Sequence, residues 1–366
     1  MLPQLQDDYL EQGFFRMGHT IKRTRFLFVQ HKLWSVVWSR VNLQTFAFRK
    51  SQRKLIRRTL GRFALSIGPY EQRDDQDEVY HYYQSAHPLE VGRTVDDVLG
   101  DHRPTHEFRT YCLRIEDDGE LVAFSCFDVG DATLSSLFGC YLPEYASLSL
   151  GYATMLFEMQ HGRSLGLAYY HPGYCVPGCS VFAYKERLPG LEGRTYLSDG
   201  WRPLPEVVAH PLPHQLILGA LDNLSIELTR LELPHSLSYQ PLSEMMPVTS
   251  DGYGAMPEPA MVRIDYPTLL GEVFVAYDAP SGRYQVWFGQ PVMDLELDPD
   301  FERAPLELPG SSSLRWYETR AVLFSEPDVR ACAEQLMPKQ LYAMLIRAVY
   351  LARLRGTDAR GTSREW

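Results

Sequence analysis

The segment from residue 119 to residue 185 constrains the fold of this chain more than any other part of its sequence. Apolar residues alternate over 121–129 and 133–142, recur with a period of about 3.6 over 151–165, and alternate again over 168–176. Alternation is typical of β-strands, and the longer period is typical of α-helices. The segment therefore predicts two strands, a helix that follows a turn at Pro143, and a further Tyr-rich strand.

One more strand precedes this segment. Residues 108–115 alternate, and the sequence Glu-Asp-Asp-Gly-Glu that follows them predicts a hairpin turn. Three consecutive strands should therefore form an antiparallel meander before the helix begins. We expect this arrangement to be the core of an α+β domain.

Three blocks of this core resemble the C-terminal motifs of the arginyl/leucyl-tRNA-protein transferase family. They are GELVAFSCFDVGDATLSSLFGCYLPEY, SLSLGYATMLFEM and LGLAYYHPGYCVPGCSVFAYK, and the resemblance extends over residues 8–201. It implies a GNAT-like acyltransferase core that moves arginine or leucine from charged tRNA to a protein N-terminus, with Asp or Glu as the acceptor's first residue. It also implies that aminoacyl-tRNA is the co-substrate, and we predict no other cofactor.

The net charge of −10 conceals a basic segment near the N-terminus. From Arg16 to Arg62 there are 13 Lys or Arg residues and no Asp or Glu, so this segment should attract a polyanion. Within it, FRKSQRKLIRRTLGRF (residues 48–63) resembles a basic motif of the same family and has helical spacing. We expect this helix to contact RNA phosphates, and a solvated helix face is the alternative. The predicted tRNA-binding residues are Arg49, Lys50, Arg53, Lys54, Arg57 and Arg58.

The loop before the predicted helix is the expected donor site. In GNAT folds this turn directs backbone N–H groups at the donor's phosphates, because the first turn of a helix has unpaired donors and a positive dipole end. Ser149 and Gly151 lie there, while Leu148 occupies a position where coenzyme A enzymes carry Gln or Arg. A plain N-cap is the alternative role for Ser149.

Further donor contacts are predicted on two strands. Tyr170 and Tyr174 should share one face of the Tyr-rich strand, and Gly173 between them lets a ligand approach the backbone. Ser135 and Ser136 lie on the strand expected to hydrogen-bond the donor. Ordinary core aromatics are the alternative for the two tyrosines.

Three residues are predicted to take part in catalysis. Asp128 would bind or deprotonate the incoming amine, Tyr141 would orient the leaving ribose, and Lys185 would meet an acidic side chain or an RNA phosphate. A turn residue at the strand end is the alternative for Asp128. Departures from the family pattern at Leu142 and Val181 keep two other functions open: an acetyl-CoA-dependent N-acetyltransferase and an inactive RNA-binding or scaffold relative.

The sequence also lacks a cysteine cluster that the family carries near its N-terminus, where it binds metal or an iron–sulfur centre. Residues 25–41 contain no cysteine, and His31 alone cannot complete a four-ligand site. We therefore predict no metal and expect packing of apolar residues such as Val37 and Trp38 instead. The six cysteines lie mostly in apolar strand patterns, which predicts reduced, buried thiols.

The chain length is typical of two domains. A Pro-rich linker at 203–213 is expected to follow a basic N-terminal region (1–70) and the transferase core (71–202). A C-terminal α+β domain (214–356) should contain helices at 214–233 and 327–355, the latter kinked or split at Pro338, before a disordered tail (357–366). No apolar run reaches about 18 residues, so we expect no membrane span and a cytoplasmic protein.

Overall fold

The computed structural model describes residues 3–29, 32–86, 94–100, 108–239, 258–265, 271–294 and 315–347. The chain divides into two compact units. Unit 1 contains residues 1–25 and 35–210, and unit 2 contains residues 26–34 together with most of the chain after residue 210. The tail predicted at 357–366 and the end of the predicted C-terminal helix lie outside the described residues.

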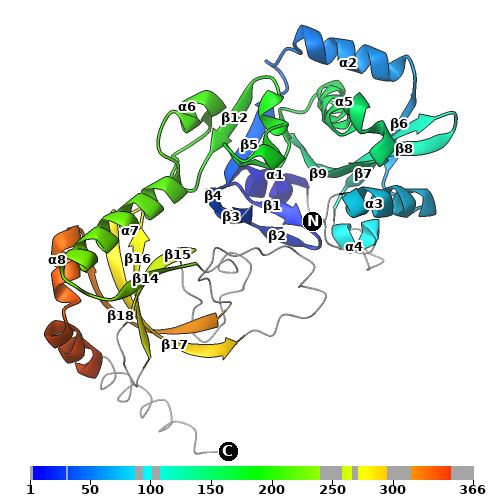
Figure 1. Cartoon of the computed structure of the whole chain (residues 1–366). Helices are drawn as coiled ribbons and strands as arrows, with labels where there is room; N and C mark the ends of the chain where they lie inside the picture. Colours follow the sequence, from blue (N-terminus) through cyan, green and yellow to red (C-terminus); the bar gives the residue numbers. More distant parts are fainter. Residues whose placement is uncertain are drawn as a thin grey trace, which may run out of the picture. The chain divides into compact units, whose positions relative to one another are not determined.

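Unit 1 is built on a nine-stranded sheet with the order β13-β12-β5-β10-β9-β8-β7-β6, in which β11 also pairs with β5 (Figure 1). Strands β7 to β9 form the predicted antiparallel meander, β6 extends it by a fourth strand that was not predicted, and β10 joins β9 in parallel. The strands are β5 (Val37–Asn42), β6 (Ala64–Pro69), β7 (Thr110–Asp117), β8 (Glu120–Val129), β9 (Thr133–Tyr141), β10 (Tyr169–His171), β11 (Tyr174–Cys175), β12 (Leu191–Arg194) and β13 (Arg202–Pro203).

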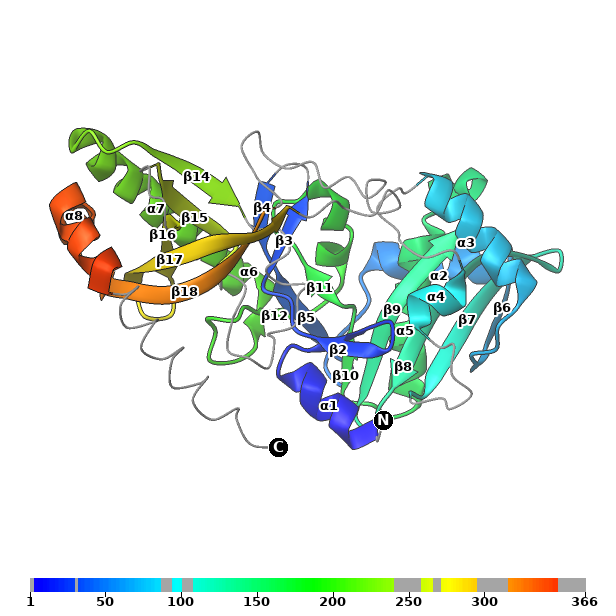
Figure 2. The ribbon, with the colours of Figure 1, turned by 90° about the horizontal axis from the view of Figure 1, so that it is seen from below.

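Helices cover both faces of this sheet. α5 (Leu150–Ser164) packs on β8 and β9, and α2 (Lys50–Leu60) packs on α5. Figures 1 and 2 show α3 (Asp74–Ala86) and α4 (Val95–Leu99) on the opposite face. We call these the α5 face and the α3 face. The α3 face also carries α1 (Pro3–Glu11) and the ribbon of β1 (Phe15–Met17) and β2 (Thr20–Lys22). The predicted α+β core is confirmed by this order of strand, helix and strand.

The core beneath α3 is apolar and contains three of the cysteines. Cys112, Cys126 and Cys140 are buried there with Tyr80 and Phe124. All six cysteines are free and buried, which confirms the prediction of reduced thiols. Within the described residues no group of His, Cys, Asp or Glu is arranged to hold a metal ion. Val37 and Trp38 are buried, as expected for the region without the cysteine cluster.

One local prediction was wrong. The strand expected over 168–176 is two strands, β10 and β11, because Pro172 lacks an N–H and Gly173 adopts a φ of 83°.

Asp7 lies within α1, which begins at Pro3. Its carboxylate accepts hydrogen bonds from the N–H of Ala132 (2.8 Å) and the Thr133 hydroxyl (2.5 Å). Asp7 thereby holds the turn between β8 and β9.

The domain limits differ from the predicted ones in two places. Residues 1–70 do not form a separate unit, because β5 and β6 belong to the central sheet. The predicted linker at 203–213 contains α6 (Leu204–Val208). The basic segment is therefore part of the scaffold that supports the core.

Unit 2 is a second α+β unit. Its five-stranded antiparallel sheet packs against α7 (Pro213–Arg230). A buried cluster of Met261, Phe274 and Ala276 lies in this sheet. Helix α8 (Val329–Gln335) ends before Pro338, and a second helical stretch runs over 338–347, so the predicted split at the proline is confirmed. The strands are β14 (His235–Tyr239), β15 (Ala260–Ile264), β16 (Glu272–Asp278), β17 (Arg283–Asp294) and β18 (Arg315–Glu326). Residues 26–34 contribute β3 (Phe26–Val29) and all of β4 (Lys32–Ser35) except its last residue, which belongs to unit 1.

Among the helices that the structure describes, none is both long and apolar enough to cross a membrane.

Candidate active site

Strands β9 and β10 part in the middle of the sheet. β10 pairs with β9 only from Thr133 to Ser135, and the chain then turns so that β11 pairs with β5. The Gly173 carbonyl accepts hydrogen bonds from the Ser39 hydroxyl (2.7 Å) and the Ser39 N–H (3.3 Å), which hold the chain against β5. β9 continues to Tyr141, so its second half lies beyond the last residue that pairs with β10.

A β-bulge marks the same part of β9. Cys126 pairs with Phe138 and Phe127 pairs with Ser136, which leaves Leu137 as the extra residue. Leu137 and Phe138 both pack into the apolar cluster on the α3 face. A bulge re-aims the side chains around it. Because of this bulge, Ser136 lies on the α5 face, whereas Leu137 and Phe138 lie on the α3 face.

Glu158 lies at the centre of the α5 face. Its side chain extends from the middle of α5 and is fully buried, with 0% of the residue exposed. The Tyr170 hydroxyl, also fully buried, donates a 2.7 Å hydrogen bond to Glu158 Oε2. Glu158 Oε1 and the neighbouring Ser125 Oγ are buried without a hydrogen-bond partner of adequate geometry. A carboxyl group this far from water needs partners, so an incomplete set is unusual.

Burial controls the protonation of this carboxyl group. It raises the pKa of Glu158 to about 7, although the hydroxyls of Ser125, Tyr170 and Ser136 and the charge of Lys185 act to lower it. Glu158 is a residue that the sequence analysis missed. The available signal was a single acidic residue within a helix that is otherwise apolar over residues 152–159 except for Thr154.

Lys185 lies beside the point where the strands part. Its ammonium group donates to the Tyr174 carbonyl (3.2 Å) and lies 5.3 Å from the centre of the Tyr174 ring. A Cβ atom at Gly173 would come within 3.3 Å of Lys185 Nζ, so glycine permits this close approach. Three predicted site residues, Gly173, Tyr174 and Lys185, are thus brought together.

Tyr141 and Gly151 meet at the start of α5. A Cβ atom at Gly151 would lie 3.1 Å from the Tyr141 ring, so the ring covers the backbone of the first helical turn. Ser149 precedes the helix in the left-handed conformation, with φ 59°, and is exposed. Ser149 occupies the N-cap position of α5, but its side chain makes no capping hydrogen bond. A left-handed serine costs roughly 1 kcal/mol or more, which is typical of functional turns.

Asp128 and Ser135 lie on the other face of the sheet. Arg16 Nη1 forms a buried ion pair with Asp128 Oδ1 (3.1 Å), and the Thr110 hydroxyl donates to the same oxygen (2.7 Å). Arg16 also donates to the Leu99 carbonyl (2.6 Å). A guanidinium stabilises the charged form of a carboxyl group and makes it a poor base. The ion pair therefore disfavours Asp128 as the group that deprotonates the amine.

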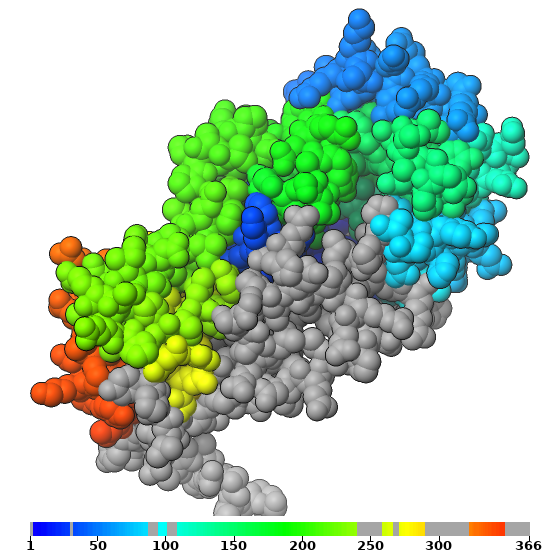
Figure 3. Space-filling view, viewed as in Figure 1, coloured from blue at the N-terminus to red at the C-terminus, as the bar shows by residue number. Residues whose placement is uncertain are grey.

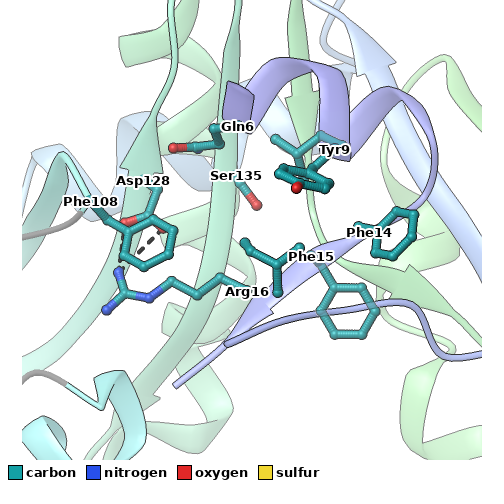
Figure 4. A pocket seen from close by; sticks show the side chains of 10 residues that line it. Gln6, Tyr9, Phe14, Phe15, Arg16, Phe108, Asp128 and Ser135 are labelled. Atoms are coloured by element: carbon teal, nitrogen blue, oxygen red, sulfur yellow. Dashed lines mark hydrogen bonds and ion pairs between the residues drawn. The ribbon is translucent and has the colours of Figure 1, made fainter. Parts of the chain in front are cut away.

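Ser135 faces a small cavity that this ion pair also lines. Figure 4 shows Ser135, Asp128 and Arg16 around it with the rings of Tyr9, Phe14 and Phe15. The cavity holds about 10 Å³, the space of roughly one water molecule. Ser135 and Ser136 are neighbours on one strand and therefore point to opposite faces. The predicted donor residues are thus divided between two faces, and Ser135 is separated from Ser136 and Tyr170. The prediction that Tyr170 and Tyr174 share a face was wrong, because Tyr174 pairs with Trp38 and its ring lies 5.2 Å from that of Phe15 on the α3 face.

The basic helix α2 lies on the α5 face. Its inner side buries Gln52, Ile56 and Thr59, and the segment forms part of the molecular surface (Figure 3). No ion pair joins its basic side chains to a carboxylate within the described residues. Arg58 Nη2 donates to the carbonyl of Leu148 (2.8 Å), just before α5. All six residues predicted to bind tRNA are exposed: Arg49, Lys50, Arg53, Lys54, Arg57 and Arg58.

A buried hydrogen-bond network joins α2 to the rest of this face. Gln52 Nε2 donates to the Tyr152 hydroxyl (2.8 Å) on α5 and to the carbonyl of Arg187 (3.0 Å). The Tyr152 hydroxyl donates to the same carbonyl (2.9 Å). Arg187 belongs to the 3₁₀ turn η3 (Lys185–Arg187), so the network connects the basic helix with the turn that carries Lys185.

Known proteins match this part of the chain. Residues 64–193 fit the model of the family described as arginine-tRNA-protein transferase, C terminus. The aspartate/glutamate leucyltransferase of Chromobacterium violaceum is 30% identical over 177 residues, covering 46% of this chain and 69% of the relative. The aspartate/glutamate leucyltransferase of Ruegeria pomeroyi is 28% identical over 201 residues, covering 54% of this chain and 71% of the relative. The chain belongs to the arginyl/leucyl-tRNA-protein transferase family.

This transferase is therefore an enzyme that uses aminoacyl-tRNA to modify protein. Solved structures resemble it only distantly. L-PGS from Bacillus licheniformis shares 16% identity and a TM-score of 0.30, covering 47% of this chain and 51% of that one. A GCN5-related N-acetyltransferase from Kribbella flavida shares 14% identity and a TM-score of 0.25, covering 46% and 53%. Scores this low support no conclusion, and the fold assignment follows from the strand order of the sheet.

Proposed function

We propose that this transferase moves leucine from leucyl-tRNA to the α-amine of a protein whose first residue is Asp or Glu. The names of its curated relatives favour leucine over arginine and specify the two acidic acceptors. The structural observation that carries the proposal is the junction of α2 with α5. An exposed basic helix touches the loop that opens α5 through the hydrogen bond from Arg58 to Leu148.

This junction fits a donor that carries its acyl group on RNA. The exposed side chains of α2 would neutralise phosphates of the acceptor stem. The N–H groups at the start of α5 would bind the phosphate nearest the terminal nucleotide, since a helix N-terminus favours anions. Tyr141 and Tyr174 would flank the terminal adenosine and the ester, because base rings stack on aromatic side chains. The helix roles use residues of the α5 face, and the Tyr174 ring lies against that of Phe15 on the α3 face.

The chemistry mainly requires placement. Transfer from an ester to an amine is energetically downhill, so holding the two reactants together supplies much of the rate acceleration. The amine must be neutral to attack, and the ester oxygen must be stabilised as charge develops on it. No cofactor beyond aminoacyl-tRNA is required by this scheme. A cytoplasmic location is part of the proposal, because charged tRNA is found there.

The proposal is tested with the full-length protein and labelled donors offered separately: leucyl-tRNA, arginyl-tRNA and acetyl-CoA. Peptides beginning with Asp, Glu and Ala serve as acceptors. Labelling of the Asp and Glu peptides from leucyl-tRNA alone is the expected result. Labelling from arginyl-tRNA would contradict the donor assignment, and labelling only from acetyl-CoA would contradict tRNA dependence. Tight tRNA binding without any product would identify an inactive relative.

A further inference from the structure

Buried Glu158 has no role in the placement of the donor proposed above. It occupies the α5 face between Ser136 on β9, Tyr170 on β10 and Lys185, at the point where the strands part. One of its oxygens is hydrogen-bonded and the other lacks a partner of adequate geometry, as does Ser125 Oγ beside it. Most buried carboxyl oxygens in proteins have a partner, so the second oxygen of Glu158 is a position at which a proton can be received.

We propose that Glu158 takes up the proton that the acceptor's amine loses, and that the Ser136 hydroxyl passes this proton inward. The inference rests on the proposed transfer reaction. Glu158, Tyr170 and Ser125 are almost completely buried, whereas Ser136 is half-buried. Of these four residues, Ser136 is therefore the one that a substrate can reach. Glu158 acts through it and is a positioning and proton-accepting residue.

The step balances without an added reagent. The amine nitrogen forms a bond to the ester carbonyl carbon, and its proton moves through Ser136 to Glu158. The bond from that carbon to the ribose oxygen then breaks, and the same proton returns along Ser136 to give the ribose hydroxyl. Glu158 ends as it began, and nothing is oxidised or reduced. In acyl transfer, one group commonly serves first as general base and then as general acid.

Other candidate bases on the core are less suitable. Asp128 is held in its ion pair with Arg16. Burial, with a contribution from Arg40, lowers the pKa of His171 to about 3, so the imidazole is too weak a base. A base works best when its pKa lies near the working pH, a condition that the burial of Glu158 provides.

The titratable groups facing Glu158 come from two elements. Tyr170 on β10 has its pKa raised by burial, so it does not change charge near neutral pH. Lys185 contributes a positive charge from η3. A change in rate near pH 7 that depends on Glu158 is therefore assigned to its carboxyl group.

Single-turnover transfer from leucyl-tRNA to an Asp-initiated peptide, measured against pH, tests the inference. Glu158→Gln keeps the shape of the side chain and a hydrogen bond to Tyr170 but removes the base. We expect its rate to fall by about 100-fold or more, without the acidic limb that wild type shows near pH 7, and with leucyl-tRNA binding unchanged. Ser136→Ala should lose about 10-fold or more. Ser164→Ala, an exposed serine at the other end of α5, is the matched control.

The possible failures are distinct. A Glu158→Gln enzyme that keeps wild-type rate and the acidic limb would overturn the inference while leaving the proposed function intact. If Glu158→Gln does not fold, full activity in Ser136→Ala would overturn it in the same way. A wild-type protein that transfers no amino acid from any charged tRNA would overturn the proposed function, and the inference with it.

Discussion

The two faces of the central sheet each bury a carboxylate, and they treat it in opposite ways. On the α3 face, Asp128 is paired with Arg16 and bonded to Thr110. On the α5 face, Glu158 has hydroxyl neighbours and a more distant lysine, and one of its oxygens lacks a partner of adequate geometry. A paired buried charge is a structural element, whereas a buried carboxyl group poised near neutrality is typical of catalytic sites. The comparison teaches that burial alone does not identify the functional residue.

The largest expected effect comes from breaking the pair on the α3 face. Arg16→Met leaves Asp128 buried without its counter-ion, and such a change costs about 3–5 kcal/mol of stability. Urea unfolding measures the loss. The double variant Arg16→Met with Asp128→Leu should recover most of it, because no charge is then left unpaired. If Arg16→Met alone were neutral, the pair would not be the structural element described here.

On the α5 face, the charged form of Glu158 should destabilise the protein, so that stability depends on pH. Burial raises the pKa of Glu158 from its ordinary 4.5 to about 7, so the folded state binds the proton more tightly than the unfolded chain does. Wild type should therefore lose stability as pH rises from about 4.5 to 7, by about 3 kcal/mol relative to Glu158→Gln. Thermal unfolding of both proteins at pH 5 and pH 8 measures the difference. Parallel pH profiles would show that the Glu158 carboxyl group is already charged at low pH.

A third variant sharpens the contrast by loosening the α5 face without changing its charge. Gln52→Leu removes the hydrogen bonds to Tyr152 and to the Arg187 carbonyl. We expect a loss of about 1–3 kcal/mol in stability, because buried partners are left unsatisfied. The rate of transfer at saturating leucyl-tRNA should also fall, because these hydrogen bonds hold η3, the turn that carries Lys185. Gln44→Leu, an exposed glutamine bonded to Leu167, is the control and should leave both quantities near wild type.

The smallest effect on stability should come from the surface of α2. Replacing Lys54 and Arg57 together by Ala should leave unfolding unchanged within about 0.5 kcal/mol. It should weaken tRNA binding and reduce the slope of log affinity against log salt by about 1–2. Arg73→Ala, an exposed arginine before α3, is the matched change on the other face. An equal loss of tRNA affinity in Arg73→Ala would mean that tRNA does not bind preferentially to the α5 face.

Local patterns explain how much of this arrangement the sequence predicts. The meander, α5 and the basic helix follow from periodicity, because each pattern is completed within a few turns or strand residues. The six exposed basic residues of α2 follow from the same reasoning. The break at Pro172 and Gly173 could have been predicted from the residues themselves, and its effect on strand pairing could not.

Interactions between distant residues account for what the sequence could not show. Arg16 and Asp128 are separated by 112 positions, so the pairing that makes Asp128 a poor base is invisible along the chain. The bulge at Leu137 decides that Ser136 faces α5, and it depends on the register between β8 and β9.

By itself, the sequence determined the succession of strands and helices, the acid-free basic segment and the family, because all three are written in neighbouring residues. Only the tertiary structure decided which carboxylate is paired with a cation and which carboxyl group has a pKa near 7. The physical reason is that a pKa depends on the dielectric surroundings and the charges within a few ångströms, and folding alone sets both.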